Sequence, residues 1–401
     1  MARLVFLGCI VYLVTGFGQV VLGTVMEPMV HAYGVQYGDG GQLVMNQFLG
    51  GMVGIMCAPW LMARIGKKGI ILSMLALIAV CEAVYLLQPP WLTMLLVSPL
   101  AGLGLGTVEA LVGSFVIAAA AGNANKAMSR VEIFFGLGAL LMPFVGSLLI
   151  SLGIWKISFA LVSILAAAAW LLWLLFWPSL LDNPVAHGEE ERHEAASPMP
   201  KAARSRLVLS VCMLFFLVYV GLEMSFIHYL PSLMVQNNHL AESTASLSIS
   251  LFWATMTIGR MAAGHAADRW GGAAYLVAMC SANAVLFALM VGLDGTTATF
   301  LLAAGSGLVM SGMFAIALVF ANRTVTGLTE RTTSLLIASG GVGGALFPKL
   351  TGWCLDQFGA YGTRWLFAIL AVVLLSVLVW ALLAAKPRRS PVLLVTEGTH
   401  G

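Results

Sequence analysis

The chain has 401 residues, of which 60% are hydrophobic and only 9% are charged, and its mean hydropathy is +0.96. Soluble domains carry about 25% charged residues, so this composition excludes a soluble protein and leaves no space for a separate catalytic domain. The six cysteines are scattered and form no CxxC pair, which indicates buried thiols and no metal site. We therefore expect a polytopic protein embedded in a lipid bilayer, with no enzymatic activity, cofactor, metal or nucleic-acid partner.

Apolar segments long enough to cross a bilayer recur along the whole chain. A membrane helix needs about 20 mostly apolar residues. Twelve segments meet this requirement, and they predict an all-α fold with twelve transmembrane helices. The first segment is too long for the apolar core of a signal peptide, so we interpret it as a membrane span. The expected ranges are 4–30, 44–63, 69–88, 92–119, 131–152, 156–179, 207–235, 245–267, 273–292, 297–321, 331–355 and 362–385.

A polar connection divides these helices into two groups of six. Residues 180–206 contain charges and prolines, which predicts a solvated linker. The expected domains are an N-terminal half, 1–179, and a C-terminal half, 207–385, followed by a tail, 386–401.

Basic residues predict which side of the membrane each loop faces. Of the 20 Lys and Arg residues, we assign all but Lys156, Lys349 and Arg364 to alternate loops or to the termini, and Arg260 is counted with the loops. Because Lys and Arg accumulate in cytoplasmic loops, we expect the linker and both termini in the cytoplasm. This orientation requires an even number of spans.

The two halves resemble each other at a constant offset of 205 residues. The segment GLGALLMP resembles GVGGALFP, with Gly138 matching Gly343, and ARIGKKG resembles DRWGG, with Gly66 matching Gly271. Matching positions on the same membrane side indicate a parallel repeat about an axis along the membrane normal. The halves of major facilitator transporters are arranged in this way.

A loop motif supports the resemblance to that superfamily. GHAADRWG resembles its pattern G-x-x-x-D-R-x-G between helices 8 and 9, whereas the equivalent loop of the first half has Ala63 in place of the acid. The resemblance implies that these loops hold the cytoplasmic ends of helices together in the outward-open state. The expected cytoplasmic gate residues are Arg64, Gly66, Lys67, Gly264, Asp268 and Arg269.

Glutamates within predicted spans are the main candidates for transport chemistry. A carboxylate at membrane depth costs roughly 2.5–3.5 kcal/mol on insertion scales, so each is a functional hypothesis. Glu109 is the only charged residue between 91 and 120, and Glu223 lies among polar and aromatic residues at 219–229. Their helices, the fourth and seventh, line the central cavity in the superfamily.

The two other glutamates have stronger structural alternatives. Glu132 lies about one turn from the cytoplasmic end of the fifth helix, where it could instead pair with Arg130 or Lys126. Glu82 lies on the third helix, which we expect at the periphery, so a structural hydrogen bond is favoured there. We expect proton coupling from Glu109, Glu132 and Glu223.

Polar and aromatic residues suit a polyol substrate. Amides supply paired donors and acceptors, and an indole face can cover the C–H side of a sugar ring. Packing between helices is an equally good explanation for the aromatic residues. The candidate substrate-binding residues are Asn46, Gln47, Glu132, Glu223, Ser225, His228 and Trp253.

A narrower resemblance rests on three segments: GTVEALVGSFVI, NANKAMSRVEIFFGLGALLMP and YVGLEMSFIHYLPSLM. They are similar to bacterial proton-coupled glucose/mannose symporters, which are related to the fucose permeases. The resemblance implies a monomer in the bacterial inner membrane that takes up a hexose with protons. It implies that Glu109 stands at the position of the essential helix-4 acid, and Glu132 at that of a sugar-contacting amide. Thr24 stands where fucose permeases carry a helix-1 aspartate, so their two-acid scheme does not transfer whole.

Two other functional classes are open at this point. The same acids would serve a proton-antiport exporter of a drug, a metallophore or a lipophilic metabolite. A membrane sensor that does not transport would need a soluble signalling module, which this chain lacks.

Overall fold

The computed structural model describes residues 2–120, 124–181, 203–293, 295–325 and 329–385, and helices are the only regular structure within them. In the N-terminal part these are α1 (Ala2–Thr24), α2 (Met26–Tyr33), α3 (Tyr37–Leu86), α4 (Trp91–Ala119), α5 (Ala124–Ser151), α6 (Ile157–Leu175) and the 3₁₀ turn η1 (Ser179–Leu181). In the C-terminal part they are α8 (Ala203–Asn238), α9 (Glu242–Trp270), α10 (Gly272–Gly292), α11 (Thr296–Met310), α12 (Met313–Thr324) and α13 (Thr329–Ala385). The predicted tail, and most of the predicted linker, lie outside the described residues.

The two longest helices each contain two membrane crossings. A straight helix of 50 residues, the length of α3, would measure about 75 Å, more than twice the ~30 Å bilayer core. Instead α3 breaks at Gly66, where φ is 73°, and the 57-residue α13 breaks at Gly359, where φ is 64°. A positive φ costs little only for glycine, so these residues allow the two legs to separate.

Each of the twelve predicted spans overlaps a helix or one leg of a broken helix. Nine segments among the described residues are long and apolar enough to cross a membrane, α3 and α13 counted once each. The predicted eighth span, within α9, is 29 residues long but is not among those nine. Its polarity has a structural reason, because α9 carries several residues of the interface between the halves described below.

The internal repeat is visible in matching backbone features. Gly66 and Gly271, matched in the sequence, both adopt positive φ, at 73° and 85°. A Cβ on Gly138 would collide with the backbone carbonyl of Leu13 in α1, and a Cβ on Gly343 with that of Leu217 in α8. Each half therefore packs its fifth helix against its first helix through the same glycine.

Matched residues of the two halves contact each other where α1 and α2 meet α8. Gln19 Nε2 lies 3.8 Å from Met224 Sδ, and a Cβ on Gly23 would lie 3.0 Å from the Cα of His228. Glu27 lies beside Ser232. Each pair is separated by the same 205 residues that separate Gln19 from Met224, as expected for residues beside a twofold pseudo-symmetry axis.

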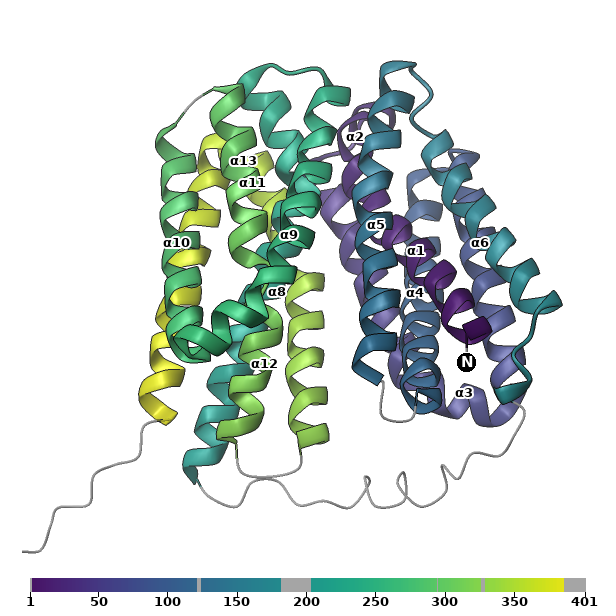
Figure 1. The fold of residues 1–401 in the computed structure, drawn as a ribbon. Helices are drawn as coiled ribbons and strands as arrows, with labels where there is room; N and C mark the ends of the chain where they lie inside the picture. The colour runs from purple at the N-terminus through teal and green to yellow at the C-terminus, as the bar shows by residue number, and fades with distance from the viewer. Residues whose placement is uncertain (1, 121–123, 182–202, 294, 326–328, 386–401) are drawn as a thin grey trace, which may run out of the picture.

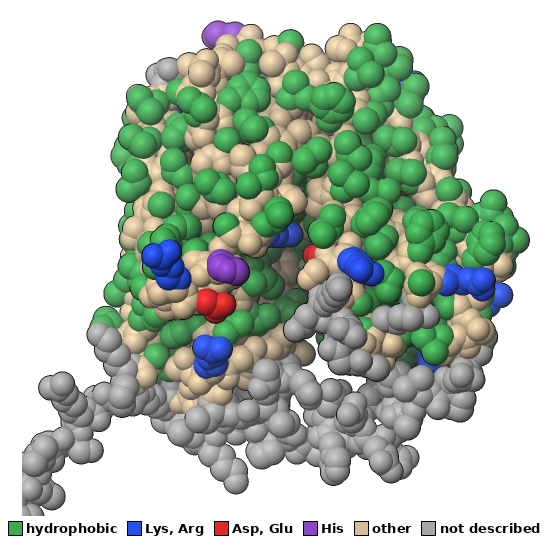
Figure 2. Space-filling view, in the orientation of Figure 1, with side chains coloured by type: hydrophobic (Ala, Val, Ile, Leu, Met, Phe, Trp, Pro, Cys, Tyr) green, Lys and Arg blue, Asp and Glu red, His purple; other side chains and the backbone are tan. Residues whose placement is uncertain are grey.

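The halves are close together at one end and apart at the other (Figure 1). We name these the α2 end, where α2 and the junction of α8 and α9 lie, and the linker end, where α1 begins and η1 ends. The space-filling view shows a closed, largely hydrophobic surface toward the α2 end and a recess between the halves toward the linker end (Figure 2). Charged side chains surround the mouth of this recess.

Candidate functional site

Glu109 is held near the centre of the N-terminal half by close packing of α4 on α3. A Cβ on Gly102 would collide with the carbonyl of Gln47, and a Cβ on Gly106 would approach the carbonyl of Gly51 to 2.6 Å. These small residues let α4 approach α3 backbone to backbone. Glu109, one turn further along α4, keeps a partly exposed side chain.

Tyr12 of α1 links Glu109 to Glu132. Its hydroxyl donates a hydrogen bond to the backbone carbonyl of Glu109, at 3.2 Å, and lies in the space that the missing side chain of Gly113 leaves open. The carboxylates of Glu109 and Glu132 both act electrostatically on this hydroxyl and on each other. Two acids from different helices therefore lie within electrostatic range of one phenol.

Glu132 lies where α5 packs against α9 of the opposite half. Ser250 of α9 donates a hydrogen bond of 2.8 Å to the carbonyl of Leu140, and the rings of Trp253 and Phe135 lie 5.8 Å apart, edge to face. A Cβ on Gly136 would lie 3.3 Å from Thr257 Oγ1. The predicted ligand residue Trp253 is thus buried in this interface, 2% exposed.

Glu223 faces the same region from α8. It is 6% exposed, and the hydroxyl of Tyr219, one helical turn away, lies within hydrogen-bonding reach of its carboxylate. Tyr219 also donates a hydrogen bond to the carbonyl of Met310, at 3.0 Å. The guanidinium of Arg260 in α9 acts electrostatically on both Glu223 and Glu132.

Arg260 therefore belongs to the site, although the sequence interpretation counted it with the loop cations. It lies inside α9, and its guanidinium carbon is 5.8 Å from the ring centroid of Trp253, two turns earlier on the same face. The seven-residue spacing between Trp253 and Arg260 was the signal available in the sequence, because residues two turns apart share a helix face.

Ser225 and His228 lie deep in the contact between α8 and α1. His228 is 1% exposed, and its Nδ1 lies 2.7 Å from the carbonyl of Met224. Ser225 is fully buried, and its hydroxyl has no hydrogen-bond partner among the described residues.

The two predicted amides of α3 hold helices of their own half together. Asn46 donates a hydrogen bond of 3.0 Å to the carbonyl of Leu95 in α4, and Gln47 donates one of 3.0 Å to the carbonyl of Gly18 in α1. The Asn46 oxygen accepts a further bond from Gln42, at 2.8 Å. In this conformation both amides serve helix packing.

Comparison with known proteins places this geometry in a family. A sequence profile described as Major Facilitator Superfamily matches residues 8–329 and 225–399. The chain belongs to the major facilitator superfamily. A glucose/mannose transporter of Bacillus subtilis (strain 168), GlcP, is 28% identical over 377 residues, which cover 91% of each chain.

Solved structures of other major facilitator proteins share the fold. A mutant of the nucleoside transporter NupG superimposes with a TM-score of 0.77 at 14% identity, covering 95% of this chain and 99% of its own. A D-xylose–proton symporter superimposes with a TM-score of 0.72 at 13% identity, covering 96% of each chain. At such identities the similarity establishes the fold and no more.

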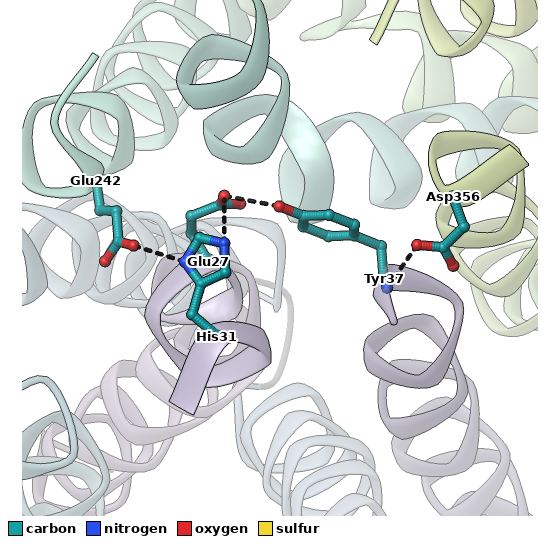
Figure 3. Close-up of polar contacts among 5 residues, drawn as sticks. All are labelled: Glu27, His31, Tyr37, Glu242 and Asp356. Atoms are coloured by element: carbon teal, nitrogen blue, oxygen red, sulfur yellow. Dashed lines mark hydrogen bonds and ion pairs between the residues drawn. The ribbon is translucent and has the colours of Figure 1, made fainter. Parts of the chain in front are cut away.

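The α2 end of this major facilitator protein is closed by a polar cluster that sequence reasoning missed (Figure 3). Asp356 of α13 accepts hydrogen bonds from the backbone N–H groups of Tyr37 and Gly38, at 2.9 and 2.6 Å. These are the first N–H groups of α3, which have no acceptor within their own helix. A carboxylate of one half thus caps a helix of the other.

Further contacts join the halves around this cap. Lys349 Nζ donates to the carbonyl of Gly38, at 2.8 Å, and the Tyr229 hydroxyl donates to that of Tyr37, at 2.7 Å. The Tyr37 hydroxyl donates to Glu27, at 2.7 Å. His31 lies 2.9 Å from Glu242 and 3.7 Å from Glu27 (Figure 3). The Tyr37–Glu27 and His31–Glu27 contacts lie within the N-terminal half. The other pairings join segments of different halves, so no sequence motif predicts them.

The predicted gate residues lie at the linker end and are not joined across the halves. Lys67 Nζ donates to the carbonyl of Leu181 in its own half, at 3.2 Å, and Arg64 lies 5.1 Å from the ring of Trp60. Asp268 and Arg269 are exposed and form no hydrogen bond or ion pair through their side chains with any residue that the structure describes. Gly264 is also exposed, and Gly66 marks the break in α3.

Proposed function

We propose that this protein takes up a hexose, of the glucose or mannose kind, by symport with protons. The linker end is assigned to the cytoplasm, so that the structure corresponds to a state open to the inside and closed to the outside. Alternating access would then close the recess at the linker end while separating the contacts at the α2 end.

One observation carries the proton coupling: Glu132 and Glu223 lie on helices of opposite halves, and Arg260 acts electrostatically on both, while Glu109 interacts electrostatically with Glu132. An ionised carboxylate in a poorly hydrated site is costly, and protonation removes that cost. Uptake of a proton by this cluster therefore changes the balance of charge between its carboxylates and Arg260. Such coupling would make the movement of the halves depend on proton binding.

The sugar is supported by the kind of side chains around this cluster and by the relative named above. Trp253 provides an indole ring in the interface between the halves, and Tyr12 and Tyr219 lie near the acids within their own halves. Carboxylates accept hydrogen bonds from sugar hydroxyls. GlcP of Bacillus subtilis is named as a glucose/mannose transporter. Neutral polyols match this mixture of aromatic planes and hydrogen-bonding groups better than lipophilic compounds do.

The energetics of a single proton are sufficient for accumulation. One charge that crosses a membrane potential of 100 mV releases about 2.3 kcal/mol. Because each 1.4 kcal/mol corresponds to a factor of ten, this energy supports a roughly fifty-fold gradient of a neutral sugar.

The proposal is tested by the variant Glu109→Gln in proteoliposomes. We expect it to lose uphill hexose uptake but to keep counterflow, in which labelled sugar exchanges with unlabelled sugar without net proton movement. Glu82→Gln is the matched control, because Glu82 is also an acid within a membrane span, 1% exposed, but lies in the second leg of α3 within one half. Normal concentrative uptake by Glu109→Gln would refute the assignment, whereas proton-driven export of a dye without any response to sugar would favour an exporter.

A further inference from the structure

The register of α5 against α9 places Glu132 of one half opposite Arg260 of the other. Three contacts define this antiparallel packing: Ser250 with Leu140, Trp253 with Phe135, and Thr257 with Gly136. From Ser250 to Thr257 these contacts follow α9 toward the linker end. On α5 the same contacts move from Leu140 toward the N-terminus of that helix. Extending this register by one further turn puts Arg260 opposite Glu132, in agreement with the electrostatic interaction between them.

Arg260 also has an acidic partner within its own half. It acts on Glu223 of α8, whose carboxylate lies next to the Tyr219 hydroxyl. Its guanidinium covers the ring of Trp253 and donates toward Met256 Sδ at 3.5 Å, a weak contact. Arg260 is exposed and forms no direct ion pair with a carboxylate among the described residues. The cation thus lies between two acids, one in each half, and is held firmly by neither.

We propose that Arg260 is a positioning residue that makes closure of the linker end depend on the proton carried by Glu132. This inference rests on the proposed proton symport and specifies how the proton acts. When the linker end closes, α5 and α9 approach each other on the linker-end side of the contact between Trp253 and Phe135. Ionised Glu132 then pairs with Arg260 across the interface. A proton on Glu132 converts the carboxylate to a neutral carboxyl group, and the ion pair is lost.

The order of events follows from this charge balance. In the outward-facing empty state the Arg260–Glu132 pair holds the linker end closed. Binding of a proton from outside, at Glu132 directly or through the neighbouring Glu109, releases the pair and lets the linker end open. Release of the proton into the hydrated inner recess restores the carboxylate, whose attraction to Arg260 closes the linker end again. In the open state Arg260 is left with Glu223 of its own half.

The titratable groups around this pair come from four helices. Glu132 lies on α5, Glu109 on α4, Tyr12 on α1, and Glu223 with Tyr219 on α8. Removing Arg260 leaves their carboxylates without this cation, whereas lysine keeps the charge but not the planar guanidinium.

The test measures hexose accumulation and downhill uptake by Arg260→Gln, Arg260→Lys, Glu132→Gln and the double variant with both glutamines. We expect Arg260→Gln to lower proton-driven accumulation at least tenfold while downhill uptake continues. The reason is that movement of the halves would no longer depend on protonation of Glu132. Arg260→Lys should recover part of the accumulation. The double variant should accumulate no less than Glu132→Gln alone, since the pair is already broken. Arg323→Gln, an exposed arginine near the linker end of α12, is the matched control and should behave as the wild type.

Several outcomes would overturn the inference. Wild-type accumulation by Arg260→Gln would do so, as would a further tenfold loss when Arg260→Gln is added to Glu132→Gln. If Arg260→Gln alone does not fold, two comparisons still test the inference. Arg260→Lys is compared with the wild type, and the charge-balanced double variant is compared with Glu132→Gln. Failure of the wild type to accumulate hexose with a proton gradient would instead refute the proposed function, and this control is measured first.

Discussion

The hydrogen bonds from α3 to Asp356 should control how often the α2 end opens. The variant Asp356→Asn keeps the size of the side chain but removes its charge, and its amide N–H₂ group cannot accept from an N–H donor. The two bonds affected, from Tyr37 at 2.9 Å and Gly38 at 2.6 Å, join α13 of one half to α3 of the other. They can form only while the α2 end is closed.

The size of the effect follows from the kind of bond that is lost. A hydrogen bond to a charged group contributes about 1.5–3 kcal/mol, and the N-terminus of a helix favours a carboxylate further. A loss of about 2 kcal/mol in the closed state alone would shift the equilibrium toward opening roughly thirty-fold. The shift should be largest at low ionic strength, because Asp356 is partly exposed and salt screens its charge.

Labelling of a buried cysteine measures this equilibrium. Ser232→Cys, in a background without the six native cysteines, places a thiol at a fully buried position of α8 beside Glu27. In right-side-out vesicles, an impermeant maleimide should label it about thirty times faster when Asp356→Asn is added. Asp39→Asn is the control, because Asp39 caps the same helix within its own half, at 3.2 Å from the N–H of Gln36. Equal labelling with and without Asp356→Asn, or an equal increase with Asp39→Asn, would refute the reasoning.

Three smaller perturbations test other parts of the account. His31→Ala removes a contact of a 58% exposed side chain, and such pairs contribute at most about 1 kcal/mol, so labelling of the same thiol should rise less than about fivefold. Gly343→Ala would place a methyl group against a neighbouring backbone carbonyl and should destabilise the purified protein by about 1–3 kcal/mol in thermal unfolding. Gly292→Ala is the control, because Gly292 has open space at its Cα, and its thermal unfolding should be unchanged. Trp253→Ala removes an aromatic contact worth about 1 kcal/mol and should raise the KM for hexose by up to roughly fivefold; an unchanged KM would place the sugar elsewhere.

The architecture could be predicted from the sequence because its determinants are local or periodic. Apolar segments of bilayer length, basic loops and a constant repeat offset are properties of the chain itself. The glycine matches at Gly138 and Gly343 were informative for a physical reason: only glycine allows the fifth helix of each half to approach the first so closely.

The contacts that close the α2 end could not be predicted in this way. Asp356 and Gly38 are 318 residues apart, and their pairing depends on the relative orientation of the two halves. Nothing in the local sequence distinguishes Asp356 from an ordinary polar residue at a helix end. Lys349 was given no role for the same reason, although its ammonium group bridges the halves.

The residues proposed to carry transport were predicted only in part. Buried acids are conspicuous in apolar segments, so Glu109, Glu132 and Glu223 could be selected from the sequence. Arg260 was assigned to a loop because basic residues were counted by side of the membrane. The structure places it inside α9 beside Trp253. There it interacts electrostatically with acids of both halves, which a solvated cation in a loop would not do.

The central claim is that a hexose and a proton cross the membrane together. The most direct measurement is the external pH of a lightly buffered suspension of de-energised cells or right-side-out vesicles when glucose or mannose is added. We expect immediate alkalinisation of the medium, abolished by a protonophore and absent with Glu109→Gln. Sugar entry without any change in external pH, or acidification of the medium, would contradict proton symport.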